Sequence, residues 1–139
     1  MPTFLFLYGA AFATLHSLFR FDLGFKIHYI ILVMLCLPRM YKYYIHTTEP
    51  AAKRLAHMFI LTAILGGICW LLDRTFCDTL STWFINPQGH ALWHIFMGSN
   101  VYFADAFLQF CRAQQRQWNP EIRHVLGLPY VKIFKVKRE

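Results

Sequence analysis

Four long apolar runs most constrain what this chain can fold into. They cover residues 3–19, 24–44, 55–72 and 90–111, and most charged residues fall between them or after the last one. About 20 apolar residues are enough for a helix to cross ~30 Å of hydrocarbon. Hydrophobic residues make up 57% of the 139 residues and charged residues 15%, which is too apolar for an ordinary soluble domain. The sequence therefore predicts an all-α integral membrane protein, one domain over residues 1–139 with about four transmembrane helices.

Local features qualify this prediction. The first run is short for a span, and a signal peptide cleaved near Ala13 is the rival interpretation, although the N-terminus lacks the positive charge of such peptides. Pro38 is expected to bend or end the regular part of the second helix. Gly66 and Gly67 should allow the third helix to pack closely. Three cysteines lie in apolar runs and are expected to be small core residues: Cys36, Cys69 and Cys111. The fourth, Cys77, is expected to lie in a loop.

The loop charges predict an orientation. One side would carry Arg39, Lys42, Lys53, Arg54 and the basic tail of residues 112–139, whereas the other would carry only Arg20, Lys26 and Arg74. By the positive-inside rule the first side is cytosolic, including the C-terminus, and the 74–88 loop is lumenal. The net charge of +7 therefore reflects membrane orientation or contact with lipid, and no nucleic acid is expected as a partner. The tail is expected to lie on the membrane surface.

His90 and His94 are the candidate metal ligands. Residues at positions i and i+4 lie on one face of a helix, so their two imidazoles can share one metal ion. The alternative is a pair of interfacial histidines bonded to backbone and water. The topology gathers other polar side chains at the same membrane face, which favours a metal or catalytic pocket; they are His16, Ser17, His28, Tyr29 and Asp73.

Four segments carry a resemblance to a known family. Residues 87–94 (PQGHALWH) and 69–77 (CWLLDRTFC) resemble the C-terminal signature of alkaline ceramidases, and residues 38–45 and 111–116 are similar to the plant-like phytoceramidase branch. The resemblance implies the last four helices of a seven-helix bundle in the endoplasmic reticulum or Golgi membrane. It implies a zinc-dependent amide hydrolase that cleaves ceramide to a sphingoid base and a fatty acid. His90 and His94 match two zinc ligands, Tyr29 is the best match to a pocket tyrosine, and Cys77 matches a loop cysteine.

The chain departs from the family in what it lacks. The family's third zinc histidine, a nearby serine, an acidic residue and a calcium-binding acidic segment belong to three further helices that have no counterpart in this sequence. The resemblance therefore implies the C-terminal half of a ceramidase, with an incomplete site. Two other readings stay open: a catalytically inactive membrane protein that binds lipid or pairs with a full-length relative, and a zinc-binding receptor-like module. The sequence does not identify a protein partner.

Overall fold

A computed structural model describes residues 2–19, 22–82 and 88–134. By its internal contacts the chain divides into two compact units, Met1–Tyr41 and Lys42–Glu139, and each is described by itself. No sequence feature predicted this division. Several charges used for the predicted orientation lie outside the described residues: Arg20, Lys135, Lys137 and Arg138.

The first unit is helical. It contains α1, Pro2–Phe19, and most of α2, Asp22–His46. Both helices agree with the predicted runs. Of the two predicted effects of Pro38, ending the helix is wrong, because α2 continues through it to His46, whereas a bend stays a prediction. A proline removes one backbone hydrogen bond and crowds the carbonyl one turn before it, yet helices in apolar surroundings tolerate this loss better than exposed ones.

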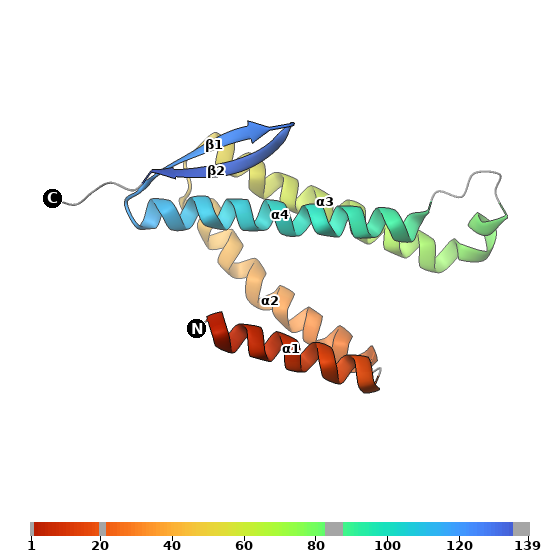
Figure 1. The fold of residues 1–139 in the computed structure, drawn as a ribbon. Coiled ribbons are helices and arrows are strands. Elements are labelled where there is room, and N and C mark those ends of the chain that lie inside the picture. The colour runs from red at the N-terminus through yellow and green to blue at the C-terminus, as the bar shows by residue number, and fades with distance from the viewer. Residues whose placement is uncertain (1, 20–21, 83–87, 135–139) are drawn as a thin grey trace. The chain divides into compact units, whose positions relative to one another are not determined.

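The second unit is built on two antiparallel helices, α3 (Pro50–Ser81) and α4 (Gly89–Gln115), which lie side by side (Figure 1). A Cβ on Gly66 would lie 3.3 Å from Phe96 Cβ and 3.3 Å from Met97 Sδ, so Gly66 makes the predicted close approach. A Cβ on Gly67 would meet nothing within 4 Å. The buried core lies between the first half of α3 and the second half of α4, with Leu55, Phe103, Phe107 and Phe110 among its members.

α3 is longer than predicted. It extends nine residues beyond Leu72 to Ser81, and its backbone leaves helical geometry at Phe76 (φ −120°, ψ 19°). Arg74 and Cys77 therefore lie in this helix, which corrects their predicted loop position. Cys77 is exposed and free, and Cys111 is buried as expected. Cys69 is partly buried, whereas Cys36 is exposed in its unit, so the core prediction for Cys36 is wrong.

Membrane crossing is supported most directly for α3. Among the described helices, its stretch Pro50–Thr79 is the one that is long and apolar enough to span a membrane, whereas the apolar stretch Phe6–Phe19 of α1 is shorter. The four predicted helices are confirmed as helices. Membrane crossing by α1, α2 and α4 stays a prediction.

The C-terminal segment corrects the all-α prediction. After α4, strands β1 (Asn119–Val125) and β2 (Leu128–Phe134) form an antiparallel hairpin in which Val125 pairs with Leu128. The two turn residues, Leu126 and Gly127, have φ values of 52° and 82°, as a two-residue hairpin turn with two positive φ angles requires. The predicted tail of residues 112–139 is thus not one segment, because residues 112–115 belong to α4.

Candidate functional site

The two predicted metal ligands lie together at the start of α4. The Nε2 atoms of His90 and His94 are 3.2 Å apart, and their ring planes meet at 81°. One helical turn separates the residues, so the expected placement on one face is confirmed. In the absence of a metal, one Nε2–H donates to the other Nε2.

This spacing fits two ligands of one zinc ion. Zinc–nitrogen bonds are about 2.05 Å long and meet at tetrahedral angles, which places two ligand nitrogens about 3.3 Å apart. The observed 3.2 Å between the two Nε2 atoms is close to that value. The two Nε2 atoms are therefore close enough to bind one metal, once the rings turn so that both nitrogens point to it in place of each other.

Asp73 of α3 lies behind His90. Its Oδ2 is 3.9 Å from Nδ1 of His90, on the edge of the imidazole away from Nε2. A metal-binding histidine commonly directs its other ring nitrogen to a carboxylate, which fixes the tautomer and orients the ring. Asp73 was predicted as one of the polar side chains of this membrane face, and its place beside Nδ1 suits an orienting partner of His90.

Gly89 allows this juxtaposition. It is buried at the first residue of α4, and a Cβ there would lie 3.0 Å from Asp73 Cβ and 3.2 Å from the carbonyl oxygen of Cys69. Both neighbours are fixed close to the backbone of α3, so a side chain at position 89 would push the two helices apart. The absence of a side chain therefore brings His90 to Asp73.

Trp93 flanks the histidine pair. Its ring centroid is 4.4 Å from that of His94 and 5.2 Å from that of His90. No role was predicted for Trp93, although it lies inside the segment that carries the family resemblance. Its contact with both rings limits their rotation.

The other predicted polar residues belong to the first unit. There, His28 lies with Nδ1 3.1 Å from Tyr8 Oη and stacks on Phe12 at a centroid distance of 4.2 Å. Tyr29 is 47% exposed within its unit. The predicted gathering of His16, Ser17, His28 and Tyr29 with the histidine pair stays a prediction. Tyr8 was not singled out from the sequence, because nothing in the chain pairs positions 8 and 28 before the helices fold together.

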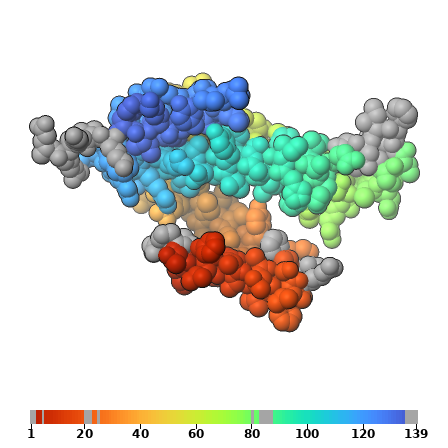
Figure 2. Space-filling model, in the orientation of Figure 1, coloured from red at the N-terminus to blue at the C-terminus, as the bar shows by residue number. Residues whose placement is uncertain are grey.

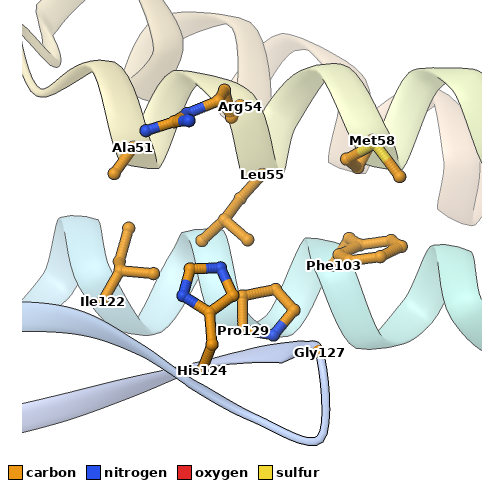
Figure 3. Close-up of a pocket in the computed structure, with 9 residues that line it drawn as sticks. All are labelled: Ala51, Arg54, Leu55, Met58, Phe103, Ile122, His124, Gly127 and Pro129. Carbon is orange, nitrogen blue, oxygen red and sulfur yellow. The ribbon is translucent and has the colours of Figure 1, made fainter.

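Within the described residues, no group of three or more His, Cys, Asp or Glu side chains could hold a metal ion. A cavity of about 240 Å³ lies elsewhere, between the first turns of α3 and the hairpin (Figure 3). Its lining residue on α4 is Phe103, 13 residues after His90 and hence about 20 Å along the helix. This cavity is therefore separate from the histidine pair.

Comparisons with known proteins identify the family of this chain. The model of the Ceramidase family matches residues 1–132. The chain is 63% identical over 140 residues to an alkaline ceramidase from Arabidopsis thaliana, covering 100% of this chain and 55% of that protein. It is 24% identical over 143 residues to alkaline ceramidase 3 from Mus musculus, covering 97% of this chain and 53% of that protein.

The chain thus spans about half the length of the curated relatives it matches. No solved structure matches it significantly. The family match extends over nearly the whole chain and includes both histidines, Asp73 and Gly89. The chain therefore belongs to the ceramidase family.

Proposed function

We propose that this chain forms part of a zinc-dependent ceramidase, in which His90 and His94 bind the metal. The observation that carries the proposal is the 3.2 Å separation of two Nε2 atoms with a carboxylate behind one of the rings. The match to the ceramidase family supports ceramide as the substrate class. Hydrolysis would release a sphingoid base and a free fatty acid.

Each residue has a distinct part in this proposal. Zinc, when bound, lowers the pKa of a coordinated water toward ~7 and polarises the amide carbonyl. His90 and His94 would hold the metal through Nε2, and the Asp73 carboxylate, with Oδ2 3.9 Å from Nδ1 of His90, would orient that ring and stabilise its positive charge. Tyr29 would donate its hydroxyl hydrogen to the oxygen of the attacked carbonyl as negative charge develops there.

A ceramide-class substrate carries long hydrocarbon chains and can reach a site from within a bilayer. α3, which carries Asp73, is among the described helices the one long and apolar enough to span a membrane. We place the site in an endoplasmic reticulum or Golgi membrane, with the C-terminal hairpin on the cytosolic side as the loop charges predict.

The third protein ligand of the metal would come from outside this chain. Catalytic zinc sites have three protein ligands and an open position for water, and the described residues bring two histidines together. Because the matched relatives are about twice as long, the proposed active unit includes the remaining half of such a protein. A second candidate function, a catalytically inactive lipid-binding or partner protein, is favoured by the lack of a third ligand group in the described part of the chain.

Release of fatty acid from a fluorescent ceramide distinguishes the two candidates. We expect no release above background from the chain alone in membranes. Joined to the N-terminal half of the Arabidopsis relative, it should become active, and His94→Ala should abolish that activity. His46→Ala, which removes a histidine from the end of α2, is the matched control and should leave activity intact. Inactivity of the joined protein with zinc bound would favour the second candidate.

A further inference from the structure

The C-terminal hairpin has two different faces. On the inner face Pro120, Ile122 and Val131 are partly buried, and the Tyr102 hydroxyl of α4 donates a 2.6 Å hydrogen bond to the carbonyl of Pro129. The outer face is exposed and consists of four residue pairs: Asn119 with Phe134, Glu121 with Lys132, Arg123 with Tyr130, and Val125 with Leu128. In Figure 2 no other described segment covers the visible side of the hairpin.

The exposed side chains of the hairpin change in polarity with distance from the turn. At the turn they are apolar: Val125 is 57% exposed, Leu126 99% and Leu128 56%. Farther from the turn they are charged and aromatic. Lys132 Nζ and Arg123 Cζ lie 5.0 Å and 5.9 Å from the ring centroid of Phe134, and Arg123 Nη2 also donates to Glu121 Oε2 at 2.9 Å, so the band keeps a net positive charge of one. An apolar tip followed by a cationic band has the order of layers that a protein meets on entering a membrane from water.

No contact within the described fold offsets the conformational cost of Leu126. Its φ of 52° lies in the left-handed region, where a leucine is disfavoured and Asn, Asp or Gly is usual in such turns. Its side chain is 99% exposed, so packing inside the described structure does not offset that cost. A leucine at this position is accounted for by an apolar environment outside the described fold.

The position of the hairpin along α3 also suits contact with a membrane that this helix crosses. The cavity between them is lined by Ala51, Leu55 and Met58 of α3 and by Ile122 and Gly127 of the hairpin, with Ile122 opposite Ala51 and the turn toward Met58 (Figure 3). Met58 lies eight residues, or about 12 Å, beyond the start of α3. α3 is the described helix best suited to cross a membrane. The tip is thus level with the interior of that helix, whereas the opposite end of the hairpin is level with its start.

We propose that the outer face of this hairpin docks on an anionic lipid surface, with Leu126 and its apolar neighbours entering the acyl-chain boundary. Arg123 and Lys132 lie two and four residues from the turn segment along their strands, hence about 7 to 13 Å back from it. They then lie among the lipid phosphates. This role is independent of the histidine site and of ceramide cleavage.

Depth-dependent fluorescence tests the proposal on the full chain in vesicles. Leu126→Cys is made with Cys36, Cys69, Cys77 and Cys111 replaced by alanine, and an environment-sensitive fluorophore is attached. In phosphatidylcholine–phosphatidylserine vesicles we expect blue-shifted emission and quenching by lipids with brominated acyl chains. The matched control is Asn119→Cys, an uncharged position on the same face but far from the turn, where acyl-chain bromines should quench little.

Two further variants separate lipid docking from other causes. Arg123→Gln and Lys132→Gln should each lower the ratio of membrane-inserted to free protein about fivefold in the anionic vesicles. One cation near an anionic lipid surface strengthens binding by about that factor. Leu126→Asn suits the left-handed turn and should keep the fold, yet reduce acyl quenching of a fluorophore placed at Leu128→Cys. Water-like emission at position 126 in these vesicles would refute the proposal. So would shielding seen in native membranes but not in vesicles of the purified chain, because that would identify a protein occupant.

Discussion

The contact between Asp73 and His90 gives a quantitative prediction for zinc affinity. Asp73→Asn keeps the shape of the side chain and one acceptor oxygen but removes its charge. When His90 binds a metal through Nε2, its ring becomes more positive, and the carboxylate at Nδ1 stabilises that charge. Two unit charges 3.9 Å apart attract by about 1 kcal/mol in water and ~4 kcal/mol at an effective dielectric constant of 20.

The exposure of the pair decides which value applies. The side chains of His90 and Asp73 are 63% and 32% exposed, so water screens much of the interaction and the lower value is the better guide. We therefore expect Asp73→Asn to weaken zinc binding about five- to tenfold, near the lower end of the ~10- to 100-fold loss usual for such partners. Asp73→Ala, which also removes the acceptor, should weaken it further.

Competition with a zinc-sensitive indicator in detergent measures this difference at fixed pH. Asp78→Asn is the matched control, because Asp78 is an exposed aspartate on the same helix, five residues after Asp73. This variant should bind zinc as the unsubstituted chain does. Unchanged affinity in Asp73→Asn and Asp73→Ala, together with loss of zinc in His90→Ala, would refute the orienting role while leaving the ligand assignment intact.

Three other outcomes follow from the same geometry. The purified chain should bind zinc weakly or substoichiometrically, and replacing both His90 and His94 with alanine should remove this zinc. An unchanged zinc content of the double variant by elemental analysis would show that the ligands are elsewhere. Gly89→Ala should separate α4 from α3 and cost about 0 to 2.5 kcal/mol of stability in denaturant unfolding, because the ~0.5 to 1 kcal/mol gained by removing a helical glycine is set against ~1 to 3 kcal/mol of overpacking. Cys77 should be alkylated without prior reduction, and resistance would reveal a bonding partner.

The sequence by itself determined the helices and the spacing of the ligands. Apolar runs of suitable length fold locally into helices, because every backbone group of a helix is satisfied within the segment. On such a helix His90 and His94 lie on one face whatever surrounds them. The close approach at Gly66 also followed from local chemistry, since a helix surface without a side chain is where a neighbour can come nearest.

The C-terminal hairpin was not predicted from the sequence, although its local pattern is partly that of paired strands. Its strands are rich in Ile, Val, Tyr and Phe, and Gly127 marks the turn, yet Leu126 is an unusual partner for that turn and two prolines lie in the strands. These departures obscured a pattern that otherwise indicates two paired strands. The sequence predicted only a surface-lying tail.

Only the tertiary structure decided which group stands behind the histidines. Asp73 and His90 are 17 residues apart, on different helices, and no periodicity within either helix states how the two pack. Their contact depends on the register of α3 against α4, which the missing side chain at Gly89 permits and the buried residues between the helices fix. A ligand pair within one helix follows from helical geometry, whereas the carboxylate that orients it depends on packing energy summed over both helices.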